Sequence, residues 1–184
     1  VGALAGLSLA QACVQFGSDL LGERGVAVFA RARAFPLLVK FIDAAERLSV
    51  QVHPDNATAP DGSCGKTEAW VILDTTPDAE LIIGVRGAID LAGIEAQLVR
   101  QVVTPGEAWL VPARTVHAIG AGVLLYEIQQ PSHVTWRIYD WGRDREIHVE
   151  QALHVAIPDQ LATRQCARAS GDGWEDLIRS DYFT

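Results

Sequence analysis

The chain has 184 residues, of which 49% are hydrophobic and 21% are charged. This length and composition predict one compact globular domain with a sizeable core, and they exclude an intrinsically disordered chain. The formal net charge is −8 and the isoelectric point is near 5.0. Because binding to a nucleic acid or to an anionic membrane needs a basic surface, we expect neither as a partner.

The cysteines and the apolar opening segment limit the cellular location. Three cysteines without a CxxC pair predict neither a disulfide framework nor a thiolate zinc site, so we expect a reduced, cytoplasmic setting. No basic segment precedes the apolar residues 1–14, and no run reaches the ~20 apolar residues of a membrane span. The chain begins at Val1 and contains no methionine, so we expect its natural start to lie upstream.

The first element predicted along the chain is a helix over residues 7–21. Apolar residues recur there at intervals of three and four, Ser8 is a candidate N-cap, and Gly22 is a candidate stop. A short basic linker, residues 31–35, follows. Residues 1–34 are therefore expected to form an N-terminal helix and linker ahead of the main domain.

A β-rich region comes next, in which short apolar segments are separated by Gly, Pro, Asp or Ser. The predicted strands cover residues 35–43, 48–54, 68–75, 79–86, 99–106, 107–113, 116–122, 123–129 and 134–141. Many short strands at this spacing predict a β-barrel or sandwich over residues 35–150. One helix is expected inside it, over residues 89–98, with Asp90 as N-cap.

The C-terminal region, residues 151–184, completes a helix predicted over residues 148–157. A polar, irregular stretch follows. The closing letters DYFT are expected to begin a second β-domain that is cut short.

A candidate metal site is formed by residues of three predicted strands. In residues 49–53 the polar Ser49, Gln51 and His53 alternate with two valines, so the polar side chains share one face of a strand. Glu68 opens a later strand, and His117 follows a turn that starts at Pro105. Gln51, His53, Glu68 and His117 together supply two oxygens and two nitrogens, enough for one divalent ion.

The order of these residues resembles the two motifs of the cupin barrels. Arg114 stands where cupins usually have Gly, Ala121 where many have Asn, and Gln51 where the first His is usual. The motifs QVHP, GKTE, VHAIG and YDWGR, in that order, closely resemble the class I mannose-6-phosphate isomerases in their short bacterial form, which are zinc enzymes of the cupin superfamily. The resemblance covers residues 35–153 and implies a mainly β, cupin-type jelly-roll barrel.

The resemblance also implies a function and a set of site residues. The metal ligands would be Gln51, His53, Glu68 and His117, holding one Zn²⁺, and Arg137 would act beside the metal. The substrate would be a sugar phosphate, with interconversion of mannose 6-phosphate and fructose 6-phosphate.

Further site residues are predicted from strand alternation. Lys66 lies two residues before Glu68, hence on the same face, although a surface lysine is the plain alternative. Arg137 lies between Trp136 and Ile138 and should point inward if these neighbours pack outside; pairing with Asp140 or Glu127 is its structural alternative.

Proton transfer and phosphate binding leave several candidates. Glu127 is one candidate for proton transfer; His53 and a metal-bound water are the others. Ser49 is a candidate contact for the substrate phosphate, and Lys40 a weaker one. The long polar loop over residues 54–67 is interpreted either as a functional lid or as a mobile flap.

Two other functions compete with the isomerase. A cupin that binds a metal and a sugar or sugar phosphate without catalysis would keep the same ligands, and Arg114 gives this alternative some weight. The second is an iron oxygenase of the cupin type. Such oxygenases usually have more histidines at the metal, and here Gln51 occupies a position where a histidine is usual, so this alternative is less favoured.

Overall fold

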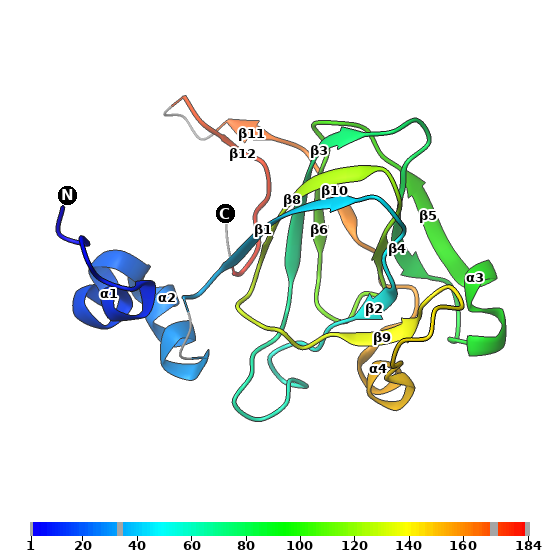
Figure 1. Cartoon of the computed structure of the whole chain (residues 1–184), viewed down its shortest axis with the longest axis horizontal. Helices are drawn as coiled ribbons and strands as arrows, with labels where there is room; N and C mark the ends of the chain where they lie inside the picture. The colour runs from blue at the N-terminus through cyan, green and yellow to red at the C-terminus, as the bar shows by residue number, and fades with distance from the viewer. Residues whose placement is uncertain (1, 33–34, 170–172, 183–184) are drawn as a thin grey trace.

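The computed structural model of the chain describes residues 2–32, 35–169 and 173–182. Its larger part is a barrel-like β-domain made of two antiparallel walls, and Figure 1 shows the strands surrounding a common interior. No helix in these ranges is both long enough and apolar enough to cross a membrane.

The first wall is a five-stranded sheet with the order β1-β8-β3-β6-β10. Its strands are β1 (Leu38–Ala44), β3 (Glu68–Thr75), β6 (Ala108–Val111), β8 (Val123–Gln129) and β10 (Thr163–Gln165). Neighbouring strands are antiparallel, so that Lys40 of β1 and Trp70 of β3 both lie directly across from Glu127 of β8.

The second wall combines a three-stranded ladder, β5-β4-β7, with a two-stranded ladder, β2-β9. Its strands are β2 (Val50–Val52), β4 (Glu80–Val85), β5 (Leu98–Val102), β7 (Ala118–Ile119) and β9 (Trp136–Tyr139). Gln51 and His117 exchange both backbone hydrogen bonds at 2.9 Å, which joins β2 to the chain entering β7. The two ladders therefore form one continuous wall.

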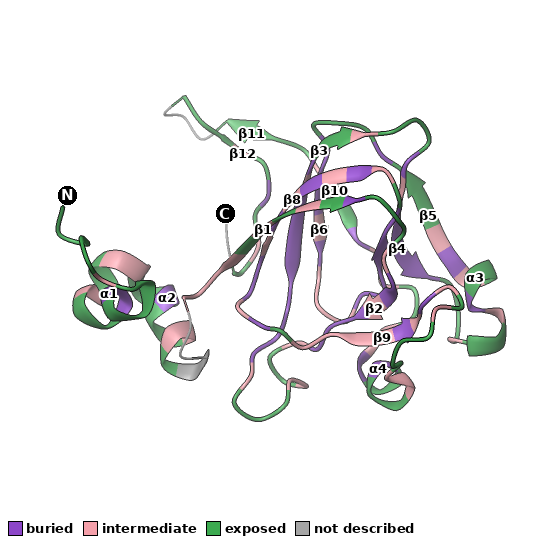
Figure 2. Cartoon of the chain, viewed as in Figure 1, coloured by how far each residue is buried: buried purple, intermediate pink, exposed green. Residues whose placement is uncertain are grey.

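The interior between the walls is apolar at one end and polar at the other. Buried side chains from both walls form the apolar core, among them Trp70, Ile72, Leu81, Trp109, Val111, Ile119 and Leu125. Alternate residues of β8 are buried, because successive side chains of a strand point to opposite faces. Val123 and Leu125 thus enter the core, and Glu127 and Gln129 continue the same face into the polar end. Figure 2 shows buried residues along these strands and a largely exposed α1.

A second cluster of apolar residues packs on the outer face of the second wall. Helix α4 (Val149–Val155) covers this face, and its Ala152 and Val155 are fully buried there. Val50 and Val52 belong to the same cluster. The two valines therefore point away from the interior, on the face opposite Gln51, as their alternation predicts.

The N-terminal helix differs from the prediction because two glycines interrupt it. Helix α1 (Leu9–Phe16) begins at Ser8, which forms a capping box with Gln11, and it ends at Gly17, whose φ is 48°. Helix α2 (Ser18–Ala32) follows and is kinked at Gly22. Gly22 was expected to stop the helix, but the chain resumes helical geometry beyond it. Residues 33–34 of the predicted linker lie outside the described residues.

Two other segments refine the predicted order. The helix expected over residues 89–98 is a short 3-10 turn, η1 (Leu91–Gly93), followed by α3 (Ile94–Gln97), and Asp90 caps it by accepting from the Ala92 amide. The stretch predicted to be irregular after α4 instead supplies β10, which extends the first wall beside β6. The hairpin strands β11 (Arg168–Ala169) and β12 (Glu175–Asp176) also lie there.

The closing DYFT was expected to begin a strand. Asp181 and Tyr182 form bends, and residues 183–184 lie outside the described residues.

A buried carboxylate fixes the turn that follows β9. Asp140 is 3% exposed, and its two oxygens accept hydrogen bonds from the guanidinium groups of Arg143 and Arg145. The hydrogen bond from Arg145, followed by that from Arg143, lowers the pKa of Asp140 below its usual value of 3.8. The YDWGR motif thus stabilises the fold through a compact ion-pair cluster.

We expect Asp140→Asn to lower the free energy of unfolding by about 1–2 kcal/mol at pH 7, because charge-assisted hydrogen bonds are lost. The lowered pKa makes this contribution present above about pH 4 and lost as the pH falls through the folded-state pKa. Urea denaturation of both proteins at pH 7 and near pH 3 should therefore show the difference shrinking in acid.

The matched control is Asp159→Asn, since Asp159 and its partner Arg86 are both more than half exposed and 4.0 Å apart. It should change stability by less than about 0.5 kcal/mol. Equal effects of the two substitutions would contradict a special role for Asp140.

Candidate metal centre

The four predicted ligands meet at the polar end of the interior. Gln51 lies in the middle of β2 and His53 just beyond it, Glu68 is the first residue of β3, and His117 immediately precedes β7. The backbone bridge between Gln51 and His117 holds two of these residues side by side. The structure thus brings together, from both walls, residues that are up to 66 positions apart in the chain.

Three of these side chains form a compact group of donor atoms. His53, Glu68 and His117 each offer one ligand atom, and these atoms lie within 4.8 Å of one another. Each residue is 1% exposed. The Nε2 atom of His53 lies 3.2 Å from Glu68 Oε1, and that of His117 lies 3.6 Å from Glu68 Oε2.

The other ring nitrogen of each histidine is bound to a backbone carbonyl. The Nδ1 atom of His53 lies 3.0 Å from the Val134 oxygen, and that of His117 lies 2.8 Å from the Thr115 oxygen. Because a carbonyl can only accept, Nδ1 carries the proton and Nε2 presents a lone pair toward Glu68. Histidines that ligate metals are oriented by such partners.

Gln51 completes the group from the side of His117. Its amide nitrogen lies 3.4 Å from His117 Nε2. Rotation of the terminal amide by half a turn exchanges the nitrogen for the oxygen, which is the atom that a metal would accept. The geometry therefore places an amide beside the three donors, as the QVHP motif implies.

Lys66 is a buried neighbour of the group. It is 6% exposed, and its Nζ lies 2.8 Å from Glu68 Oε1 and 3.1 Å from His53 Nε2. The alternative of an ordinary surface lysine is therefore wrong. Burial by itself would raise the pKa of Glu68, but the charge of Lys66, and then the interactions with His53, outweigh it and hold this pKa well below the usual range. Burial lowers the pKa of His53 to about 3 and also lowers that of His117.

These observations test whether a metal ion fits. Both carboxylate oxygens of Glu68 are buried, and neither has a partner in hydrogen-bonding geometry among the described residues. Lys66 already places a cation beside His53 Nε2 and Glu68 Oε1. The lone pair of His117 Nε2, however, faces Glu68 Oε2 at 3.6 Å, and acceptors that face one another in this way favour a cation between them. Nitrogen and oxygen donors without thiolate suit a divalent metal. The group is a candidate metal site by geometry and by donor chemistry.

A second carboxyl group lies further along the polar end. Glu127 is 3% exposed; its Oε1 accepts from Lys40 Nζ at 2.7 Å and its Oε2 from the Trp70 indole at 3.0 Å. Burial, and then the charge of Glu68, raise the pKa of Glu127 in spite of Lys40. The pKa of Glu127 is therefore raised, whereas that of Glu68 is lowered. Opposite shifts of two neighbouring carboxyl groups are typical of acid–base sites.

Lys40 is more constrained than a free substrate contact would be. Besides Glu127, its ammonium group donates to Gln129 Oε1. The amide nitrogen of Gln129 in turn donates to the carbonyls of Gln130 and Ser132 at 2.9 Å. Gln129 is fully buried and was missed from the sequence, although its place two residues after Glu127 in one strand was a usable signal.

Arg137 shares a face with Gln51 because the two residues lie directly opposite in the β2–β9 ladder. Its neighbours Trp136 and Ile138 pack with the cluster beneath α4. The guanidinium donates to the Glu146 carbonyl, and its Nε is buried without a hydrogen-bond partner among the described residues. The contacts described for Asp140 and Glu127 do not include Arg137, so the structural pairing considered from the sequence is not observed.

Ser49 is buried just before β2, at 6% exposure. Its role as a phosphate contact stays a prediction.

The loop between His53 and Glu68 is anchored at both ends. Asp55 Oδ1 accepts from the amides of Ala57 and Thr58, and Asn56 Oδ1 accepts from the Gly65 amide at 2.8 Å. A Cβ on Gly65 would approach the Asn56 nitrogen to 2.6 Å, so this contact requires glycine. These bonds hold the loop in a defined conformation, which argues against the mobile flap.

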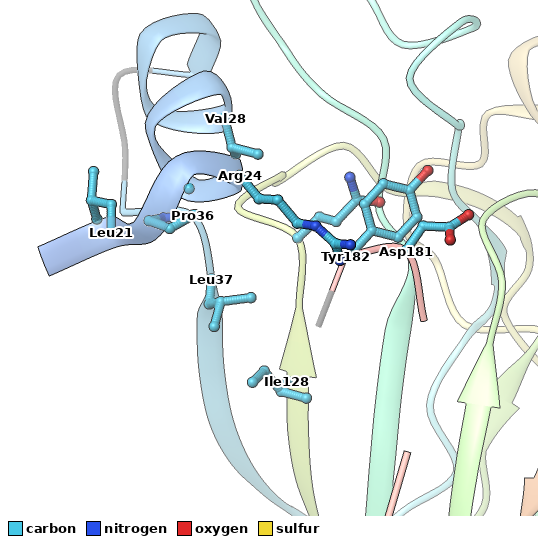
Figure 3. Close-up of a pocket in the computed structure, with 10 residues that line it drawn as sticks. Leu21, Arg24, Val28, Pro36, Leu37, Ile128, Asp181 and Tyr182 are labelled. Atoms are coloured by element: carbon cyan, nitrogen blue, oxygen red, sulfur yellow. The ribbon is translucent and has the colours of Figure 1, made fainter. Parts of the chain in front are cut away.

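A pocket of about 240 Å³ lies away from the centre, between α2, the chain entering β1, and the C-terminal residues. Figure 3 shows Arg24 extending from α2 toward Tyr182 across this pocket. None of the predicted site residues lines it, so the pocket is separate from the candidate metal site.

The chain is similar in sequence to curated mannose-6-phosphate isomerases. It is 38% identical over 172 residues to the mannose-6-phosphate isomerase of Streptococcus mutans, covering 84% of this chain and 54% of that protein. It is 41% identical over 147 residues to mannose-6-phosphate isomerase ManA of Bacillus subtilis, covering 68% of this chain and 47% of that protein. The chain thus spans about half the length of the curated relatives it matches. No family model matches it.

Solved structures agree with the sequence matches. The mannose 6-phosphate isomerase of Bacillus subtilis superposes with a TM-score of 0.81 at 29% identity, over 99% of this chain and 62% of that chain. A phosphomannose isomerase variant from Salmonella typhimurium gives a TM-score of 0.66 at 18% identity, over 90% of this chain and 65% of that chain, which shows likeness of fold alone.

The structural match confirms the mainly β, cupin-type fold expected from the sequence. Together the comparisons identify the chain as a homologue of the mannose-6-phosphate isomerases, matched over about half of their length.

Proposed function

We propose that this chain carries the metal centre of an aldose–ketose isomerase that interconverts mannose 6-phosphate and fructose 6-phosphate. The observation that supports this most is the buried carboxylate of Glu68, faced by the lone pairs of His53 and His117 inside a homologous barrel. Residues 35–150 would be the metal-binding domain, together with the rest of α4 and with β10, which pack on its two walls. Residues 1–34 would form an N-terminal extension.

One Zn²⁺ held by Gln51, His53, Glu68 and His117 is the cofactor we propose. Oxygen and nitrogen donors without thiolate favour zinc and also admit iron, cobalt or manganese. Bound there, the ion would supply Lewis acidity to the oxygens of the sugar.

Glu127 is the residue that we propose moves the proton between the two neighbouring carbons. Its raised pKa, caused by burial and by Glu68, brings a carboxyl group closer to the working pH of a general acid–base. Hydrogen bonds from Lys40 and from the Trp70 indole hold the carboxyl group of Glu127 in one orientation. Proton transfer requires such orientation as well as a suitable pKa.

Cationic side chains would balance the negative charge of the substrate. Arg137, with a buried Nε that lacks a partner, and Lys66, beside Glu68, are proposed to stabilise charge that develops on the sugar oxygens. Ser49 and Lys40 are proposed to contact the phosphate group.

Isomerase activity of the purified 184-residue chain tests the function directly. We expect conversion of mannose 6-phosphate to fructose 6-phosphate, loss of the activity after chelation, and its recovery when zinc is added. The measurement is a coupled assay for fructose 6-phosphate with matched zinc analysis. Stoichiometric zinc without turnover would instead support a cupin that only binds.

Removal of the ligand carboxylate tests the metal centre separately. We expect wild type to hold about one zinc ion per chain and Glu68→Gln to hold almost none, because the only formal negative charge among the four ligands is lost. Elemental analysis after gel filtration measures both. Glu80→Gln, which changes a partly exposed glutamate paired with Arg100, is the control and should retain zinc. Full zinc content in Glu68→Gln would disprove the centre.

Arg137→Ala should reduce kcat on the order of a hundredfold, the loss typical of one charge-stabilising donor. Zinc content and melting temperature should change little, and Arg137→Lys should restore activity only in part, since it lacks the planar fork. Arg100→Ala, on β5, is the matched control. Unfolding of Arg137→Ala would show that the contact with the Glu146 carbonyl is structural, and an unchanged rate would remove Arg137 from the mechanism.

A further inference from the structure

Arg114 occupies a backbone conformation that favours glycine. It is the third residue of the turn in which the Thr115 amide donates to the Pro112 carbonyl at 3.2 Å, and its φ is 74°. A residue with a Cβ is sterically disfavoured in the left-handed region. Glycine would remove that cost, so an arginine here needs side-chain interactions that offset it.

The side chain of Arg114 joins two other segments. Its Nε donates to the Val155 carbonyl at 2.8 Å, at the C-terminal end of α4, where a cation is electrostatically favoured. Its Nη1 lies 3.4 Å from Asp55 Oδ2, in the loop that follows His53. The guanidinium is about one-third exposed, so it reaches both partners from the surface. Arg114 therefore ties α4 and the loop after His53 to the turn that precedes His117.

The backbone at Arg114 connects these side-chain contacts to two metal ligands. Its amide donates to the carbonyl of His53 at 2.7 Å, and its carbonyl accepts from the Ile157 amide at 3.0 Å. The next residue, Thr115, supplies the carbonyl that orients the His117 ring. A change in this turn would thus move the backbone of one ligand and the ring of the other.

We propose that Arg114 is a positioning residue for the metal centre: its side chain fixes a strained turn so that His53 and His117 are held ready for the ion. The inference rests on the proposed metal centre and adds a residue from outside the ligand set. Preorganised ligands bind more tightly because less conformational freedom is lost on binding. The variant that relieves strain should therefore bind metal worse.

The experiment compares zinc affinity with stability in Arg114→Gly. Glycine accepts the backbone conformation, so the variant is expected to fold with a melting temperature close to that of wild type in the metal-free state. Its zinc affinity, measured by competition with a chromogenic chelator, should fall about tenfold or more, the usual effect of removing a group that orients ligands. The melting-temperature gain on adding zinc should shrink in parallel.

Two further variants separate the side chain from the backbone. Asp55→Asn keeps the Oδ1 acceptor that caps Ala57 and Thr58 but removes the charge that faces Arg114, so it should lower zinc affinity in the same direction. In the double variant Arg114→Gly with Asp55→Asn, the losses should be less than additive, since both remove one interaction. Additive losses would show that the Arg114–Asp55 interaction does not position the ligands.

Matched controls lie away from the centre. Asp78 also has a positive φ, of 60°, so Asp78→Gly relieves comparable strain. Arg86→Ala removes an arginine that pairs with an exposed aspartate. Both should leave zinc affinity unchanged.

The outcomes distinguish this inference from the proposed function. Zinc affinity of Arg114→Gly within about twofold of wild type would overturn the positioning role while leaving the centre intact. An equal loss in Asp78→Gly would also overturn it, since the effect would then be general. Wild-type chain that binds no zinc would overturn the metal centre itself, and the role of Arg114 with it.

Discussion

The burial of the Glu68 carboxylate is the constraint on which the rest of the site depends. A charged carboxylate removed from water needs compensating partners, because desolvation of an unpaired charge costs many kcal/mol. At 1% exposure, Glu68 obtains charge compensation from Lys66 at 2.8 Å, whereas the two imidazoles turn lone pairs toward it. The pKa of Glu68 stays low because of these charges, and the same carboxylate then contributes to the raised pKa of Glu127. One buried charge thus sets the protonation state of the whole polar end.

The two walls allow such burial because the interior between them is apolar at one end of the strands and polar at the other. On β8, Leu125 and Glu127 point to the same face two residues apart, so the apolar core ends where the polar network begins. The polar residues there are bound to one another across neighbouring strands, as Lys40, Glu127 and Trp70 are. Polar networks of this kind are tolerated when nearly every member has a partner. Among the described residues, the buried side-chain atoms without a hydrogen-bond partner belong to Glu68 and Arg137. The proposed function assigns a metal to the first and a substrate to the second.

Much of the fold and the identity of the candidate ligands could be predicted, because both depend on local periodicity and on short motifs. Alternation in residues 49–53 was sufficient to assign Gln51 and the valines to opposite faces. The break at Gly17 and the strand β10 could not be predicted, since the first depends on a backbone angle and the second on an edge that only the folded sheet supplies. The same is true of the Val134 and Thr115 carbonyls: every residue has a carbonyl, so no residue type marks the ones that orient the histidines.

The charge balance of the centre explains how an acidic protein could bind an anionic sugar phosphate. The chain carries a formal charge of −8, but charges more than about 10 Å away are largely screened at moderate salt, so the local balance decides. At the centre, the negative charge of Glu68 is matched by the positive charge of Lys66 at 2.8 Å, and Lys40 matches Glu127 in the same way. The protein side chains are therefore locally neutral apart from Arg137. A divalent ion held among them would make the site strongly positive only when it is bound, so metal binding and attraction of the phosphate would be coupled through the same few residues.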